Sequence, residues 1–338
     1  MLSSRRRCPG VRRPLLAVAA TSSVLMASGC ASETPREPSP WILDEAPFVV
    51  TGAEGGDPEL FLARNRFDTA WVRLTVHPGL DNSATWSPDG RFVVFHSDRD
   101  AGDTPDLDLY RLEPGSGEPP VRLTAERGFD YLPDYAPDGR RIAFLSRRAE
   151  AEWPQGSPGH VYVMGADGSG TRRATRLPVA ASLGPAWMAD GTSLLVARRV
   201  EPDGPTVLAR IWLDFDAPED EPLEVRDEIL VRDDLFNYTP APAPDGQRIA
   251  YTAEGSEGTA VVILDLVSGE RKIVLEGGFN YVDEWTPDGR WILVTRWDPE
   301  SRSRDPWLLS ADGAEAHRPL LEPAHRSGSD VSFRPVKR

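Results

Sequence analysis

Short apolar runs recur along the chain, and each of them follows a tight turn. In the first clear copy, Phe92-Val93-Val94-Phe95 follows Ser87-Pro88-Asp89-Gly90, with Arg91 between them. Pro presets φ at the second position of such a turn, Asp tolerates the third position, and Gly accepts a positive φ at the last. The apolar run that follows is typical of a buried β-strand. Each copy of the pattern therefore predicts a β-hairpin.

The pattern occurs five times, at steps of 43 to 55 residues, and most copies are followed by a second hairpin such as DLDLYRLEPGSGEPPVRLT from Asp106. Four strands in a period of this length indicate the blades of a β-propeller. A helical repeat would need apolar faces at 3.6-residue spacing, which Gly and Pro at this density would break. The copies are WSPDGRFVVF from Trp86, YAPDGRRIAF from Tyr135, WMADGTSLLV from Trp187, PAPDGQRIAY from Pro242 and WTPDGRWILV from Trp285, with a truncated sixth, FRPVKR, from Phe333.

The number of strands predicts how the ring closes. Five complete copies and one isolated strand at 330–334 leave a sixth blade three strands short. The stretch from Pro47 to Thr75 supplies them, because PFVV, ELFLAR and WVRLT match the later strands of the other blades. We therefore expect an all-β, six-bladed propeller of four-stranded blades over residues 46–335, closed by three N-terminal strands and one C-terminal strand. Closure removes exposed sheet edges.

The repeated phrase WSPDGRFVVFHSDRD, followed by DLYRL and RLT, resembles the repeat of TolB-like β-propellers, which are related to WD40-type blades. The resemblance covers nearly the whole chain after residue 46. It implies a six-bladed propeller that works in the bacterial envelope as a scaffold or binding module. TolB proteins also carry an α/β domain ahead of the propeller, whereas only a tether is expected here. The similar propellers of prolyl-oligopeptidase-type peptidases accompany a hydrolase domain, but this chain has no Gly-x-Ser-x-Gly elbow.

The first 29 residues are typical of an export signal, with a basic start, an apolar stretch and small residues before Cys30 in LMASGC. This arrangement resembles a lipoprotein signal, so we expect lipidation of Cys30, which is the only cysteine left after cleavage. The alternative is an ordinary secretory signal. Residues 30–45, rich in Pro and Ser, predict a flexible tether. These features predict an exported chain, lipid-anchored on the periplasmic or extracellular face of an envelope membrane.

The chain is acidic, with 38 Lys and Arg residues against 53 Asp and Glu residues and a net charge of −15. The signal holds five arginines and no acidic residue, so the net charge of the remaining chain is −20. Such a charge repels nucleic acid and anionic lipid head groups. We therefore expect an envelope protein or peptide partner with a basic segment, and membrane attachment through the lipid.

Four loops between predicted blades pair an Asp or Asn with a Tyr or a second Asn, at equivalent points near the channel mouth. Repeated round a ring, such groups can bind one ligand. The alternative is that the Asp or Asn caps its own turn and the Tyr packs between blades. Asp134, Asp283 and Glu284 add negative charge nearby, which would suit Ca²⁺, and no other cofactor is expected. The candidate binding residues are Asp81, Asn82, Asp130, Tyr131, Asn237, Tyr238, Asn280 and Tyr281.

Other features are assigned a structural role or an alternative function. The Asp of each Pro-Asp-Gly-type turn is expected to shape that turn, on the face opposite the binding loops. Long loops containing Trp153 and Trp297 suit a protein contact surface.

The alternative function is that of a metal-dependent polysaccharide lyase or hydrolase at the channel mouth. The histidines lack HxxxH and HExxH spacing, and no catalytic or metal-binding set is predicted from His77, His96, His160, His317 and His325.

Overall fold

The computed structural model describes the chain from residue 47 to residue 335, apart from 53–56, 66–69, 103–104, 149–158, 181–183, 200–203, 257, 301–302, 315, 318–327 and 334. The predicted signal, Cys30 and the tether lie outside the described residues, as do Trp153 and His325. In the described part of the chain, no helix is long and apolar enough to cross a membrane.

The Pro-Asp-Gly-type turns form as predicted. In the first, the N–H of Gly90 donates to the carbonyl oxygen of Ser87 at 2.8 Å, and Gly90 has a φ of 67°. The carboxylate of Asp89 accepts the N–H of Arg91 at 3.0 Å. The other four turns repeat these contacts, with φ between 65° and 70° at their glycines. The turn aspartates therefore shape the hairpins.

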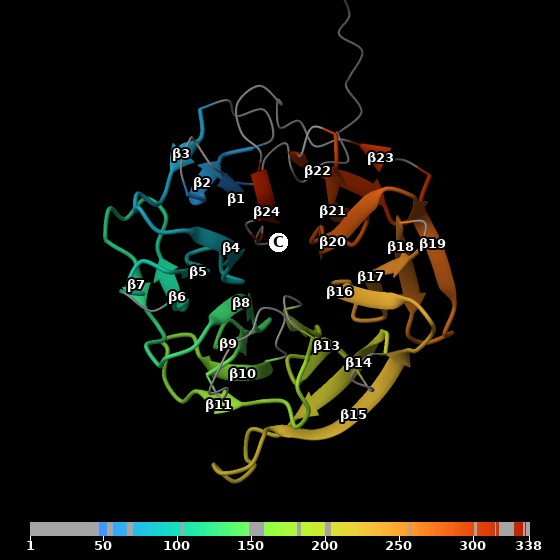
Figure 1. The fold of residues 1–338 in the computed structure, drawn as a ribbon, viewed down its shortest axis with the longest axis horizontal. Coiled ribbons are helices and arrows are strands. Elements are labelled where there is room, and N and C mark those ends of the chain that lie inside the picture. The colour runs from blue at the N-terminus through green and yellow to red at the C-terminus, as the bar shows by residue number, and fades with distance from the viewer. Residues whose placement is uncertain are drawn as a thin grey trace, which may run out of the picture. The chain divides into compact units, whose positions relative to one another are not determined.

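The described residues form six four-stranded antiparallel sheets, which we number as blades in chain order (Figure 1). Blade 1 consists of β24 (Gly328–Phe333), β1 (Phe48–Gly52), β2 (Glu59–Ala63) and β3 (Val72–Arg73). Blade 2 consists of β4 (Asp81–Trp86), β5 (Val93–Ser97), β6 (Asp108–Leu112) and β7 (Val121–Arg122). Blade 3 consists of β8 (Asp130–Tyr135), β9 (Arg141–Ser146), β10 (His160–Gly165) and β11 (Arg172–Arg173).

The remaining blades follow the same order. Blade 4 consists of β12 (Ala186–Trp187), β13 (Ser193–Arg199), β14 (Thr206–Leu213) and β15 (Glu224–Val231). Blade 5 consists of β16 (Phe236–Pro242), β17 (Arg248–Gly255), β18 (Gly258–Asp265) and β19 (Arg271–Glu276). Blade 6 consists of β20 (Phe279–Trp285), β21 (Trp291–Asp298), β22 (Ser303–Ser310) and β23 (Ala316–His317).

Blade 1 closes the ring as the strand count predicts. Its innermost strand is the C-terminal β24, and the antiparallel pairing joins Phe48 to Phe333 and Val50 to Val331. The three N-terminal strands complete the sheet outward. The all-β, six-bladed fold and its closure are therefore confirmed.

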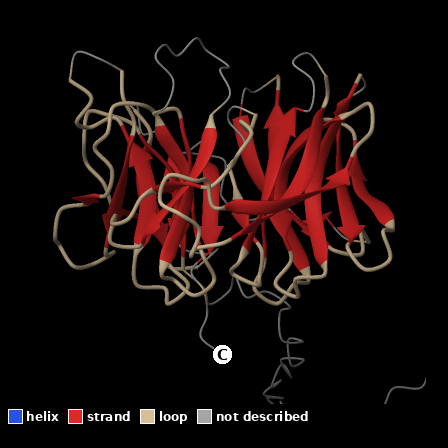
Figure 2. Cartoon of the chain, turned by 90° about the horizontal axis from the view of Figure 1, so that it is seen from below, coloured by secondary structure: helices blue, strands red, loops and turns tan. Residues whose placement is uncertain are grey.

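The core lies between neighbouring blades. The described apolar residues form six buried clusters, and each one joins side chains of two adjacent blades. Between blades 5 and 6, for example, Trp285 packs into the cluster and its Nε1–H donates to the carbonyl oxygen of Ala241 at 3.0 Å. The strands run between two faces that carry the loops (Figure 2). The Pro-Asp-Gly turns occupy one face, and the loops between blades occupy the other.

Candidate functional site

Four of the predicted residues lie at equivalent positions in the first two residues of the innermost strands, nine residues before the turn glycine. They are Asp81 in β4, Asp130 in β8, Asn237 in β16 and Asn280 in β20, and we call them the mouth residues. Each is at most 1 % exposed. A buried polar side chain must find partners inside the protein. The partners differ between two pairs of blades.

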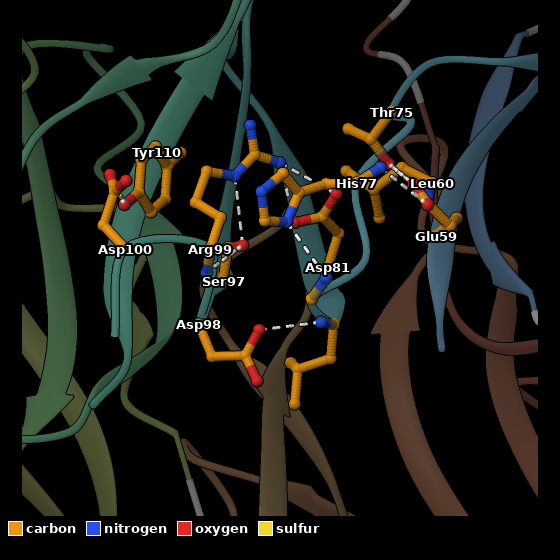
Figure 3. A network of polar contacts seen from close by, with 12 residues as sticks. Glu59, Leu60, Thr75, His77, Asp81, Ser97, Asp98, Arg99, Asp100 and Tyr110 are labelled. Atoms are coloured by element: carbon orange, nitrogen blue, oxygen red, sulfur yellow. Dashed lines mark hydrogen bonds and ion pairs between the residues drawn. The ribbon is translucent and has the colours of Figure 1, made fainter. Parts of the chain in front are cut away.

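In blades 2 and 3, which we call the Asp blades, an arginine neutralises the mouth residue. Arg99 donates to both carboxylate oxygens of Asp81 at 2.7 and 2.8 Å (Figure 3). In blade 3, Arg148 donates to Asp130 at 2.6 Å, and the Ser146 hydroxyl donates to the same carboxylate at 2.6 Å. Such charge-assisted hydrogen bonds are the stronger kind.

Both arginines are also held by aromatic rings of their own blade. The Arg99 guanidinium lies 5.3 Å from the ring centre of Phe95 and 4.8 Å from that of Tyr110. Arg148 repeats this arrangement at 5.4 and 5.0 Å, over Phe144 and Tyr162. The arginine, the carboxylate and the two rings therefore form one repeated unit.

In blades 5 and 6, which we call the Asn blades, the arginine is absent. Gly255 and Asp298 stand at the positions of Arg99 and Arg148. The Asn237 amide instead donates to Asp233 at 2.7 Å, and the Asn280 amide donates to the carbonyl oxygen of Gly277 at 2.6 Å. The neutral amide needs no counter-ion.

The remaining predicted residues follow the mouth residues directly. Asn82 accepts the N–H of Ser83 at 2.8 Å. Tyr131 and Tyr238 are both 8 % exposed and belong to clusters between blades. The Tyr238 hydroxyl donates to Glu254 at 2.7 Å, and its ring centre lies 6.0 Å from that of half-buried Tyr281. These contacts match the structural alternative, and partner binding by the eight residues stays a prediction.

A cavity of about 790 Å³ occupies the channel, and most of its wall is built from residues of the innermost strands and the turns that follow them, with Thr295 and Arg304 added from β21 and β22. Each of β4, β8, β16 and β20 has a register shift there that adds one residue to the innermost strand. Such a bulge re-aims the side chains beyond it. Three residues of these segments have φ near +50°, namely Ser83, Leu132 and Thr239. Of the eight predicted residues, Tyr281 lines this cavity.

The channel wall carries the three carboxylates that the sequence placed near the mouth. Asp134 accepts the N–H of Trp187 at 2.8 Å, and Glu284 accepts the N–H of Phe333 at 2.8 Å, so each of them joins two blades. Asp283 accepts the Thr295 hydroxyl at 2.8 Å. Burial raises the pKa of Asp134 to about 7, and burial together with the charges of Asp283 and Asp134 raises the pKa of Glu284 to about 8.

The described histidines have separate surroundings. His77 Nδ1 accepts the N–H of Gly79 at 2.9 Å, and His160 Nδ1 lies 3.2 Å from the Thr175 hydroxyl. His96 is buried, and burial lowers its pKa to about 4. Among the described residues, no group of three or more His, Cys, Asp or Glu side chains is arranged to hold a metal ion.

Exposed apolar side chains lie at the mouth beside the Asn blades, and the sequence analysis missed them. Phe236 and Phe279, 44 % and 38 % exposed, directly precede Asn237 and Asn280, and Leu235 is 38 % exposed. In blade 3, Phe129 holds the same position but is half-buried, with the Arg147 guanidinium 5.9 Å from its ring centre. The phrases GFDY, LFNY and GFNY carry these residues, so a signal was present.

Solved structures share the fold of this chain. TolB from Acinetobacter baumannii is 16 % identical, with a TM-score of 0.68 over 86 % of this chain and 67 % of that one. A chain of a nidogen–laminin complex is 13 % identical, with a TM-score of 0.57 over 85 % of this chain and 98 % of that one. No protein-family profile matches the chain, and no characterised protein matches it in sequence. The chain thus has the fold of a TolB-like propeller, as its repeats predict.

An enzyme also contains this fold. A puromycin-hydrolysing peptidase of Mycobacterium tuberculosis is 15 % identical, with a TM-score of 0.54. The match covers 82 % of this chain but only 43 % of the peptidase chain. The likeness therefore concerns the propeller and says nothing of catalysis by this chain.

Proposed function

We propose that this chain is a binding or scaffold protein of the cell envelope, anchored through a lipid on Cys30, whose loop-rich face binds a protein or peptide partner. The observation that carries the proposal is the exposure of Phe236 and Phe279 at equivalent positions of the Asn blades. Exposed aromatic side chains beside a concave cavity are typical anchors of protein interfaces. The likeness in fold to a chain of a nidogen–laminin complex is consistent with a binding role.

The charge around these aromatics favours a basic partner. Asp234 and Glu300 are exposed in loops and Glu276 is exposed at the end of β19, and the channel adds Asp134, Asp283 and Glu284. Arg304 also lines the channel, so the wall is not uniformly negative. A partner segment with lysine or arginine beside an apolar anchor would fit this surface, and its binding would weaken as salt rises.

Affinity purification from detergent-solubilised envelope tests the proposal. The tagged chain is compared with Phe236→Ala/Phe279→Ala, and with Val121→Ala/Val267→Ala, which removes exposed apolar groups elsewhere. We expect the mouth variant to lose affinity for the captured protein by on the order of tenfold or more, because buried aromatic anchors dominate interface energies. The control variant should retain the affinity.

Equal capture by all three chains would contradict a site at the mouth of the Asn blades. The anchor is tested separately with Cys30→Ala, which should release the chain from the membrane fraction. A Cys30→Ala chain that still sediments with membranes would refute the lipid anchor while leaving the binding face untouched.

A further inference from the structure

The outermost strands of the blades differ in length. In the described residues, β3, β7, β11 and β23 have two residues each, whereas β15 has eight and β19 has six. Figure 1 shows β15 on the rim of the ring. Short outer strands are one way in which proteins keep sheet edges from pairing with other chains. Blade 4 lacks that protection.

The outer edge of β15 is open along most of its length. Its inner edge pairs with β14 from Leu208 to Leu213. Its first residue is also tied to blade 3, since the N–H of Glu224 donates to the carbonyl oxygen of Ala174 at 2.9 Å. Among the described residues, no backbone hydrogen bond beyond the β14 ladder is made by 225–231. On β19, the side chain of Lys272 donates its Nζ–H to the carbonyl oxygen of Asp312 in blade 6 at 2.8 Å, which ties that strand to the next blade.

The side chains of β15 alternate between the two faces of its sheet. Arg226 and Glu228 share one face, where they form an ion pair at 3.1 Å and Arg226 lies 4.1 Å from the ring centre of Trp212. Asp227 and Ile229, which is 38 % exposed, share the other face, whereas Val225, 56 % exposed, is the extra residue of a bulge between Glu224 and Arg226. Strand edges with exposed apolar and charged residues pair only with a strand of matching pattern.

A second copy of β15, run antiparallel, has that pattern. When Asp227 faces its own copy, Arg226 lies opposite Glu228, and this pair of opposite charges occurs twice. Asp227 is already ion-paired with the buried Arg198 of its own chain, which reduces its repulsion from the copy. A shift by one residue would place Asp227 opposite Glu228 and Val225 opposite Leu230, so like charges oppose that register.

We propose that two copies of this chain form a symmetric dimer through antiparallel pairing of their β15 strands. The charges of Arg226 and Glu228 disfavour pairing with a strand of another sequence but attract a second copy of β15. The two four-stranded sheets then become one eight-stranded sheet across a two-fold axis. The proposal does not rest on the function proposed above, because β15 lies on the rim and the mouth of the channel remains open in such a dimer.

Charge reversal tests the pairing. Sedimentation velocity of the purified chain should show a dimer, and Arg226→Glu and Glu228→Arg should each weaken it by on the order of tenfold, because like charges then face each other. An equimolar mixture of the two variants should restore the dimer, since every facing pair is then of opposite sign. Within each variant chain the 226–228 ion pair stays broken, so recovery must come from pairing between chains.

The controls separate loss of pairing from loss of fold. Each variant should retain the melting temperature of the parent's monomer, and Glu118→Arg, which reverses an exposed charge in the β6–β7 hairpin, should leave the dimer unchanged. A monomeric parent chain, or a mixture that stays monomeric while both variants are folded, would overturn the proposal.

Discussion

The Asp blades and the Asn blades begin their innermost strands with almost the same sequence but stabilise that start differently. In blades 2 and 3 the mouth residue is a carboxylate held by an arginine nine residues after the turn glycine. In blades 5 and 6 that arginine is missing and the mouth residue is an uncharged asparagine. The absence of the arginine and the replacement of aspartate by asparagine occur together in the four blades in which both positions are described.

This difference shows that the buried position tolerates charge only beside its counter-charge. Taking a lone carboxylate out of water is far more costly than burying a hydrogen-bonded amide. The surface differs as well, because the ring of Phe129 faces Arg147 in blade 3 whereas Phe236 and Phe279 are exposed. The four comparable blades therefore divide into two whose mouth residues are held by ion pairs and two that expose aromatic side chains at the mouth.

The largest effect should follow from removing one arginine. Arg148→Ala leaves Asp130, which is fully buried, without its counter-ion. We expect a loss of about 3–5 kcal/mol in the free energy of unfolding, measured by urea denaturation. Arg91→Ala is the control, because its ion pair with Glu113 is solvent-exposed and should contribute less than about 1 kcal/mol. Equal losses of unfolding free energy in the two variants would show that the buried ion pair between Arg148 and Asp130 stabilises the fold no more than an exposed ion pair does.

A smaller loss should result when blade 3 receives the residues of blade 5. The triple variant Asp130→Asn/Ser146→Ala/Arg148→Gly removes the charge together with its partners. Unfolding free energy should then fall by only ~1–2 kcal/mol, which corresponds to lost hydrogen bonds and stacking without an unpaired buried charge. A triple variant as unstable as Arg148→Ala would mean that the asparagine arrangement depends on other features of blade 5.

The last effect concerns pH and the channel wall. Asp134 and Glu284 have raised pKa values of about 7 and 8 in the folded chain, so the folded state binds more protons than the unfolded state between about pH 4 and pH 8. Their contribution to stability is therefore fully present below about pH 4 and is lost progressively as the pH rises to about 7 for Asp134 and about 8 for Glu284. Urea midpoints measured across this range should fall with pH.

The matched variants assign this pH dependence. Asp134→Asn and Glu284→Gln keep an oxygen for the N–H groups of Trp187 and Phe333, and together they should flatten the decline. Asp89→Asn, in an exposed turn, should leave the decline unchanged. A decline that persists in the channel double variant would place its origin in other titrating groups.

Much of the fold could be predicted because its signals are local. The turn Ser87-Pro88-Asp89-Gly90 specifies a hairpin by its own dihedral preferences, wherever it lies in the chain. The closure of blade 1 followed from counting strands, since every blade needs four of them. The division of the mouth residues was also present in the sequence, as SDR and SRR in the Asp blades against AEG and RWD in the Asn blades. The sequence does not show that these segments contact the mouth residues, so the division could be interpreted only with the structure.

The sequence by itself determined the hairpins, the number of blades and the pairing of the two ends. Only the tertiary structure decided which side chains face the channel. The physical reason is the extra residue in β4, β8, β16 and β20, which reverses the alternation of side chains beyond it. Asp130 therefore turns into a buried ion pair while Asp134 lines the cavity. That shift belongs to the pairing of two strands, which a pattern along one strand does not encode.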